Sequence, residues 1–375
     1  MFKKAIYLLI IFILVISCRR AVTRPTLDSL GSTPLEEPDS PIIDEKPEQP
    51  DPTPEPKPES EFIIVATDTE DIIQSKIQKY YEKNQKYLAF VEGTEADIKQ
   101  NNTISKINSV INKNAYTEGI SLDLSYTTMT EIADNSFYGN KYLYSVKLPD
   151  TLTSIGNNAF ADAKKLISIN FPASLSKIGE GAFLSCTSLE NVDLKDTKIT
   201  VLNKQVFSDC SSLTKIVLPD SLLIMENSVF SYCISLEEIT LPDKFQAIGT
   251  FVFAGCSKLK KVNFNNQIQS IYHYAFYQCT SLSSISLPSS LKALGEEGKI
   301  EIFPDCTSLS DVEYLGTNPD SVTWFGNIFD NSMPNNLYLP YVEEPTDISI
   351  KDKWNKFLGY SWSGKIRYKT PMPVN

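Results

Sequence analysis

One pattern of apolar residues recurs along most of the chain and is easiest to follow from a single phenylalanine. The phenylalanines at this position are Phe137, Phe160, Phe183, Phe207, Phe230, Phe253, Phe276, Phe303 and Phe329. Neighbouring members are 23 to 27 residues apart. A period of this length is typical of solenoids, in which each repeat is one unit that stacks on the next. The sequence therefore predicts about nine stacked coils over residues 118–334.

Within one unit the pattern predicts a short strand with one apolar side. In the stretch SLENVDL, Val192 and Leu194 are two residues apart and so point to the same side of a strand. Asn191 and Asp193 point to the other side. A proline often follows this strand and ends the pairing, because proline has no N–H for the ladder. Each coil thus has an apolar lining that only its neighbours can bury, and we expect the phenylalanines to form the centre of a continuous core.

A second apolar segment follows in each unit and ends at a glycine in several of them. Examples are the pairs Ile155-Gly156 and Ile178-Gly179. Glycine adopts positive φ at little cost, so we expect it to form the turn that brings the coil round. The Ala-Phe that follows then points inward again.

This frame, SLxxIxLPxSLxxIGxxAFxxC, resembles that of the BspA-like family of bacterial leucine-rich repeats. The resemblance covers residues 118–334. It implies a right-handed leucine-rich-repeat superhelix whose coils consist of a β-strand plus a turn or short helix, and it implies adhesion to host or neighbouring-cell proteins. Two units, containing KALGEEGKIEIF and TNPDSVTWFGNIF, are longer than the frame. Such insertions map to loops on one face of a solenoid, often the binding face, and they also mark degeneration near an end.

The residues on either side of the repeats predict caps that cover the ends of the core. Residues 62–117 contain apolar residues at helical spacing, and Thr94 with Asp97 is typical of a helix start. We expect a small, mostly helical cap there, with a separate helical domain as the alternative. Residues 335–375 repeat one more strand and then leave the frame. We expect Trp354 and Phe357 to close the core at that end.

The first residues are typical of an export signal. Lys3 and Lys4 precede an apolar stretch that is short for a transmembrane helix, and the stretch ends in Val15-Ile16-Ser17-Cys18. This ending resembles the lipobox of bacterial lipoproteins, with a plain secretory signal as the alternative. The resemblance implies a signal peptide at residues 1–17 and lipidation of Cys18.

Residues 18–61 predict a disordered tether. Ten prolines lie between Pro25 and Pro58, and residues 25–61 contain eleven acidic and two basic side chains. Such a segment cannot bury enough apolar surface to fold, and its prolines and like charges favour an extended chain. We expect it to act as a stalk. The whole chain has a formal net charge of −11, which gives no electrostatic support for binding nucleic acid.

Six further cysteines occupy one position of the frame: Cys186, Cys210, Cys233, Cys256, Cys279 and Cys306. Two earlier units have Asn140 and Ala163 there, which indicates a small buried residue. We expect six buried thiols, because parallel side chains on stacked coils do not readily give the torsion of a disulfide. Metal sites need clustered ligands with Cys-x-x-Cys or histidine partners, and this pattern has neither.

The sequence gives no sign of catalysis. His273 is the one histidine, at a polar position of the frame, and we expect it to be solvated. Nucleophilic triads need a histidine partner, paired acids need a pocket, and no glycine-rich phosphate loop is present. We therefore expect neither an enzyme nor a cofactor nor a metal.

The outward-facing residues of the strands are the predicted binding surface, together with residues that flank them. They are Tyr144, Lys147, Ile167, Asn170, Asn191, Asp193, Lys215, Glu238, Thr240, Lys261, Asn263, Asp311, Glu313 and Tyr314. The charges on neighbouring coils alternate in sign, which is also the pattern of cross-strand pairs that keep a sheet soluble. Few aromatic anchors are present, so we expect weak, multivalent contacts.

The sequence thus predicts a lipid-anchored binding module at the outer membrane or cell surface. Its partner would be an extracellular protein or glycan, and it would contact the membrane through the lipid alone. The alternative is a structural scaffold lipoprotein that faces the periplasm.

Overall fold

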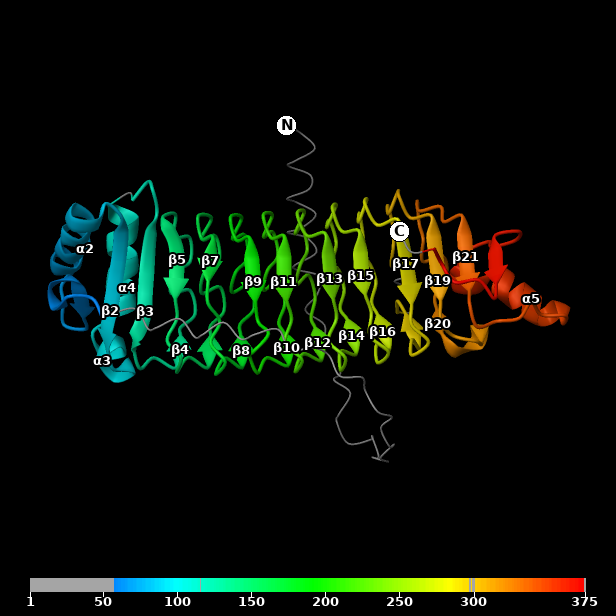
Figure 1. Cartoon of the computed structure of the whole chain (residues 1–375), viewed down its shortest axis with the longest axis horizontal. Helices are drawn as coiled ribbons and strands as arrows, with labels where there is room; N and C mark the ends of the chain where they lie inside the picture. The colour runs from blue at the N-terminus through cyan, green and yellow to red at the C-terminus, as the bar shows by residue number, and fades with distance from the viewer. Residues whose placement is uncertain (1–56, 115, 297, 299–300, 374–375) are drawn as a thin grey trace, which may run out of the picture. The chain divides into compact units, whose positions relative to one another are not determined.

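The computed structural model describes residues 57–114, 116–296, 298 and 301–373. The predicted signal peptide, Cys18 and most of the predicted tether lie outside these residues. Pro56–Asn375 form one compact unit, which is a stack of coils with a cap at each end (Figure 1). The helices are η1 (Ser60–Phe62), α2 (Glu70–Asn84), α3 (Glu95–Gln100), α4 (Thr103–Lys113), η2 (Pro319–Ser321), α5 (Ile348–Asn355) and η3 (Phe357–Gly359).

The strands form two rows along the stack, and neighbouring strands within each sheet are parallel (Figure 1). The first row consists of β1 (Ile63–Val65), β2 (Tyr87–Gly93), β3 (Ile120–Thr127), β5 (Leu143–Lys147), β7 (Ser168–Ile169), β9 (Asn191–Asp193), β11 (Lys215–Val217), β13 (Glu238–Thr240), β15 (Lys261–Asn263), β17 (Ser284–Leu287), β19 (Asp311–Tyr314), β21 (Asn336–Leu339) and β22 (Ile366–Tyr368). The second row consists of β4 (Glu131–Ile132), β6 (Ser154–Ile155), β8 (Lys177–Ile178), β10 (Val201–Leu202), β12 (Ile224–Met225), β14 (Ala247–Ile248), β16 (Ser270–Ile271), β18 (Ala293–Leu294) and β20 (Thr323–Trp324).

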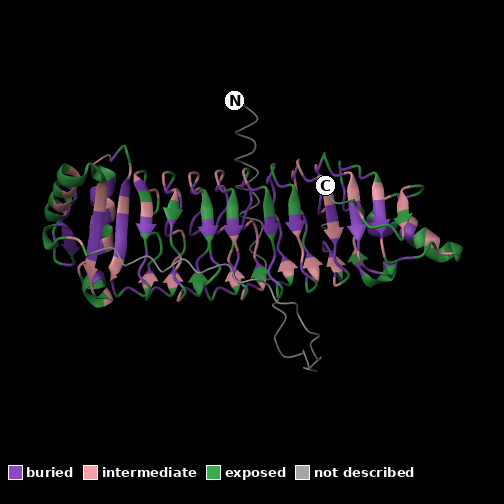
Figure 2. Ribbon diagram, in the orientation of Figure 1, coloured by how far each residue is buried: buried purple, intermediate pink, exposed green. Residues whose placement is uncertain are grey.

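The first row follows the alternation that the sequence predicts. Val192 and Leu194 are buried, whereas Asn191 and Asp193 are exposed. The colours of Figure 2 show buried and exposed positions in the same strands along this row. We call the outward side of the first row the strand face. Its hydrogen-bonded ladder is interrupted three times, because β7 and β9, β11 and β13, and β15 and β17 belong to separate sheets.

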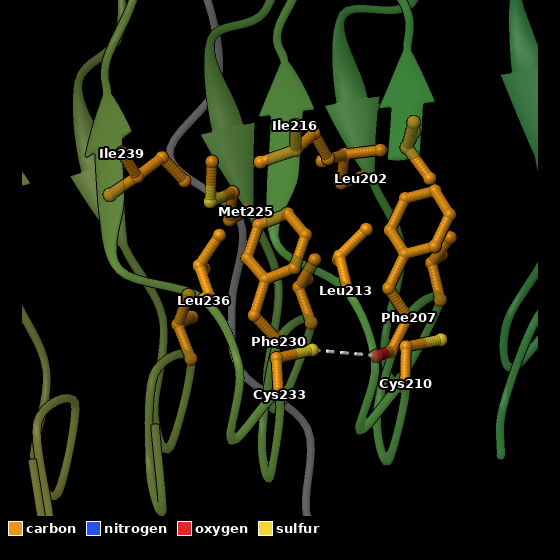
Figure 3. Close-up of a cluster of buried hydrophobic side chains, with 14 of the residues drawn as sticks. Leu202, Phe207, Cys210, Leu213, Ile216, Met225, Phe230, Cys233, Leu236 and Ile239 are labelled. Carbon is orange, nitrogen blue, oxygen red and sulfur yellow. Dashed lines mark hydrogen bonds between the residues drawn. The ribbon is translucent and has the colours of Figure 1, made fainter. Parts of the chain in front are cut away.

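The nine recurring phenylalanines form one continuous stack in the core, which we call the Phe spine. All nine are fully buried, as the sequence predicts. Neighbouring ring centroids are 5.1 to 5.8 Å apart, and neighbouring ring planes differ by at most 18°. Figure 3 shows Phe207 and Phe230 surrounded by leucines and isoleucines of both strand rows. Each ring therefore packs against the coils on both sides.

Gly156 and Gly179 do not have the role that the sequence suggested, although Gly295, at the same frame position, has a φ of 79°. Gly156 and Gly179 are not among the residues with positive φ, so the predicted turn geometry is wrong. A Cβ at Gly156 would lie 2.5 Å from the backbone nitrogen of Asp134 in the preceding coil. Glycine therefore permits close approach of two coils at this position. Non-glycine residues such as Asn158 and Asp162, at φ 50° and 58°, adopt the left-handed conformation instead, as asparagine and aspartate do more readily than most residues.

The six repeat cysteines form a column beside the Phe spine. All six are fully buried, which confirms the prediction of buried thiols. Each thiol donates a hydrogen bond to the carbonyl of the spine phenylalanine in the preceding coil, at 3.0 to 3.3 Å. Figure 3 shows the bond from Cys233 to Phe207. In the last coil Ser332 makes the same bond, to Phe303 at 2.6 Å. From Cys186 onward the position thus takes a small side chain that can donate one hydrogen bond, whereas the earlier coils have Asn140 and Ala163 there.

The N-terminal cap contains the predicted helices and also two strands that the sequence analysis did not predict. The Thr94 hydroxyl accepts a hydrogen bond from the amide of Asp97, which confirms the helix start at α3. Strand β2 pairs with β3, so the cap extends the sheet of the first coils. Residues 57–61, assigned to the tether from composition, also belong to this unit. Lys57 pairs with Glu92 and Glu59 with Lys83, both at 2.6 Å.

The C-terminal cap closes the core with aromatic side chains. Trp354 and Phe357 are buried and their ring centroids are 5.0 Å apart, as the sequence predicts. Trp362 is a further buried aromatic residue of this cap, and the sequence did not predict it. Its ring centroid lies 5.8 Å from that of Phe329, the last ring of the spine. Its indole N–H donates to the carbonyl of Phe357. The last coil therefore faces aromatic rings in place of another coil.

Removing one ring from the middle of the spine should cost more stability than removing an aromatic ring beside it. We expect Phe230→Ala to lower the free energy of unfolding by about 3–5 kcal/mol, because it leaves a cavity between two coils. Phe171→Ala is the matched control, since Phe171 is half-buried and lies beside the spine, with its ring edge-on to Phe183. Urea unfolding measures both. Equal losses for the two variants would contradict the spine's role.

The buried thiols predict a loss of stability at alkaline pH. Burial raises the pKa of the thiols of Cys186, Cys210, Cys233, Cys256 and Cys279. In the unfolded chain a thiol ionises near pH 8.5, so the stability from each neutral thiol is complete below that pH and declines above it. Between pH 7 and pH 9.5 the loss is about 1.4 kcal/mol per thiol. Cys233→Ser should reduce the alkaline loss by that amount, and an unchanged loss would refute this account.

Candidate functional site

The strand face presents mostly polar side chains over the middle coils. Asn191, Asp193, Lys215, Glu238, Thr240 and Lys261 are exposed there. Towards the N-terminal end Tyr144, Lys147 and Asn170 are also exposed. Ile167, Asn263 and Asp311 are partly buried. These residues come from consecutive coils, because each coil places the same frame position on the same face.

Charges on neighbouring coils of the strand face pair across the strands. The Lys261 ammonium lies 3.2 Å from Oε1 of Glu238, and Asn263 donates its side-chain amide to the same oxygen at 2.6 Å. These two hydrogen bonds hold the pKa of Glu238 below its usual value, and the bond from Asn263 has the larger effect. Lys147 approaches Asp123 at 3.9 Å in the same way. Lys215 makes no ion pair within the described part of the chain, so its charge is available to a partner.

A shallow groove crosses the middle of the strand face. It has a volume of about 440 Å³ and lies over β11 and β13, where the ladder is interrupted. Lys215, Glu238 and Thr240 line it, together with Val217, the apolar outward residue of β11. The groove thus combines both signs of charge with apolar residues such as Val217 and Pro242.

A second hollow, of about 250 Å³, lies where the N-terminal cap meets the strand face. Tyr144 and Tyr87 line it, with the polar side chains of Gln85, Glu118 and Ser121. Tyr144 is 41% exposed. The Tyr87 ring stacks on Tyr81 with centroids 4.2 Å apart. Burial, and then the nearby Tyr81 and Glu118, raise the pKa of the Tyr87 phenol. Tyr144 is thus an exposed aromatic residue at the edge of a polar hollow.

Two residues of the predicted binding surface are buried. Tyr314 is fully buried, and its ring centroid lies 5.0 Å from that of Phe357, so its assignment to the surface is wrong. It occupies the inward position that Leu287 has in the preceding coil. Its spacing of two residues from the inward Val312 already indicated this. Glu313 faces outward but is only 9% exposed, because its carboxylate is engaged by other parts of the chain.

His273 is buried, which corrects the expectation of a solvated side chain. It is 9% exposed and contacts the stacked rings of Phe251 and Tyr274 edge-on. Its Nδ1 is 3.2 Å from the hydroxyl of Thr250 and 3.5 Å from the carboxylate of Glu296. Glu296 is the first residue of the insertion in the next unit, the unit of Phe303. The frame position alone did not indicate that neighbouring side chains bury His273.

The groove and the N-terminal hollow could not be foreseen from the frame. Both depend on how neighbouring strands meet, which a single frame position does not encode. One signal was available for the hollow: Tyr87 to Val91 is a run of five apolar residues between polar ones, which is typical of a buried strand. That strand, β2, carries Tyr87 to the edge of the strand face.

Among the residues that the structure describes, no group of three or more His, Cys, Asp or Glu side chains could hold a metal ion. No helix there combines the length and the apolar character needed to cross a bilayer.

Comparison with known proteins identifies the repeats. The model of the BspA type leucine rich repeat region matches residues 105–236 and 223–341, in six copies. Among solved structures, a leucine-rich repeat protein from Bacteroides ovatus is 24% identical over 62% of this chain and 64% of its own, with a TM-score of 0.45. The leucine-rich repeat protein of T. pallidum is 24% identical over 65% of this chain and 85% of its own, with a TM-score of 0.30.

The pneumococcal vaccine antigen PcpA is 18% identical over 68% of this chain and 79% of its own, with a TM-score of 0.31. No curated protein has a matching sequence. Leucine-rich repeats generally serve as protein-binding modules. The match of the repeat model over well more than half of the sequence, on coils with the expected strands and core, shows that this chain belongs to the family with BspA type leucine-rich repeats.

Proposed function

We propose that this protein is a surface adhesin that binds an extracellular protein or glycan through the strand face. The observation that carries the proposal is the exposed array of polar residues on consecutive coils, with the groove of Lys215 and Glu238 at its centre. Such a broad, shallow surface suits a large partner, because deep and mostly apolar pockets are the usual sites for small substrates. We therefore also propose that the protein has no catalytic activity.

The lipid anchor and the location at the cell surface are part of the same proposal. They rest on the signal-like residues 1–17, on Cys18 and on the proline-rich stretch that follows. One acyl chain binds a membrane only marginally, and stable anchoring needs a second one, which lipidation of a new N-terminal cysteine would supply. The stalk would then hold the strand face away from the membrane.

The test of adhesion uses the compact unit from Pro56 onward against panels of matrix proteins and glycans. For a partner that binds, we expect Lys215→Glu to weaken the affinity about fivefold or more, because it reverses a charge at the groove. Lys177→Glu is the matched control, since Lys177 is exposed on β8 in the second row. Stability should change by at most about 0.5 kcal/mol in both variants.

The outcomes separate the proposal from its alternatives. If no member of either panel binds, or if Lys177→Glu weakens binding as much as Lys215→Glu, the strand face is not an adhesive surface. Protease treatment of intact cells tests the location. A domain on the cell surface is cut from its stalk, whereas a scaffold lipoprotein that faces the periplasm is protected.

A further inference from the structure

The chain's own C-terminal segment lies on one end of the strand face. After β22 the chain turns back, and the amide of Lys369 donates to the carbonyl of Leu339 at 3.0 Å. The amide of Met372 then donates to Oε1 of Glu313 at 2.9 Å. Glu313 belongs to β19, and β21 lies between β19 and β22 in the sheet. The segment therefore crosses the strands and reaches two strands back along the face.

The outward residues at this end are covered, unlike those in the middle of the face. Glu313 and Tyr338 are register partners on β19 and β21, and each is only 9% exposed. Asp193 on β9 and Thr240 on β13, which occupy the same frame position as Glu313, are exposed. Met372 is itself half-buried. The C-terminal segment thus occupies surface that remains open on the middle coils.

Glu313 is held ready to accept a hydrogen bond from a segment that crosses the strands. Its Oε2 accepts a hydrogen bond from the Ser286 hydroxyl at 2.6 Å, which fixes the carboxylate between two coils. Its Oε1 accepts the amide of Met372. A carboxylate that accepts from a backbone N–H makes a stronger bond than a neutral acceptor does. The bond uses the backbone, so it does not depend on the side chain of the residue that donates it.

The residues around Met372 explain why this segment fits. Pro371 and Pro373 flank it, so Met372 provides the single N–H of the three residues. Prolines also favour an extended chain, which reduces the entropy that is lost on binding. Asp311 and Glu313 make this end of the face acidic, and Lys369 precedes the Pro-x-Pro segment.

We propose that this end of the strand face is a binding site for an extended Pro-x-Pro segment of neutral or basic character in a partner protein. The chain's own Pro371–Pro373 occupies the site, and a partner segment must displace it. This site rests on the proposed function only in that it adds a second contact area to the same face. The acidic Pro-x-Pro stretch of the tether, from Pro50 to Pro58, has the wrong charge for it.

The test compares the full chain with a version that ends at Thr370, which keeps β22 and the bond of Lys369. The probe is the labelled peptide KTPMPVN. We expect it to bind the shortened chain at least tenfold more tightly than the full chain, where the attached segment competes at a millimolar effective concentration. Met372→Pro in the full chain removes the donated N–H and should also admit the peptide.

Two changes test the hydrogen bond itself. Glu313→Gln in the shortened chain, and a peptide with an N-methylated methionine, should each weaken binding about tenfold. Glu238→Gln, on the exposed middle of the face, and circular dichroism of every variant are the controls. The acidic peptide PDPTPEP should not bind.

Equal binding of KTPMPVN to the full and shortened chains, or no binding to either the shortened chain or Met372→Pro, would overturn this inference. Equal effects of Glu313→Gln and Glu238→Gln would do the same. None of these results would affect adhesion through the central groove, which the matrix and glycan panels test with Lys215→Glu. The two proposals can therefore fail separately.

Discussion

Every coil of this protein depends on its neighbours to bury its apolar lining. One unit of about two dozen residues has too little surface to enclose a core alone, and burial of apolar area is the main favourable term in folding. The Phe spine provides this burial, with each ring in contact with the coil before and the coil after. The caps follow from the same constraint, because the first and last coils would otherwise expose one apolar side.

The polar interactions of the core repeat with the same period and serve the same stacking. The thiol column satisfies one carbonyl per coil without introducing a large polar group. Each buried carbonyl that has a partner avoids the cost of an unmet hydrogen bond. The close approach at Gly156 and Gly179 shows how tightly neighbouring coils meet. The outward side chains do not take part in this packing, so the strand face can vary in charge and shape.

The periodic parts of the structure could be predicted from the sequence because each frame position recurs in the same environment. The Phe spine, the buried thiols and the alternation around Val192 all follow from this repetition. The departures arise where the repetition ends or is interrupted. His273 is covered beside an insertion, Tyr314 fills the core next to the C-terminal cap, and β2 belongs to a cap outside the frame. The turn predicted at Gly156 was wrong for another reason. A glycine in a sequence is compatible both with a positive φ and with close approach of two backbones, so the sequence alone did not distinguish them.

The binding surface could be predicted only in outline. Alternation identified outward residues such as Lys215 and Glu238, but not the groove between their strands. The cover on Glu313 comes from Met372, which is 59 residues away and lies outside the repeats. Contacts of this kind depend on how a terminus returns to the stack, and no local pattern encodes that return.

Hydrogen exchange along the stack tests the central claim most directly. The amides of Phe183, Phe207 and Phe230 each donate to the next coil, to Val206, Val229 and Val252. If neighbouring coils seal one another, these central amides should be the most protected in the chain, and protection should decline towards both caps. Rapid exchange of the central amides, at the rate of the exposed loops, would contradict the account.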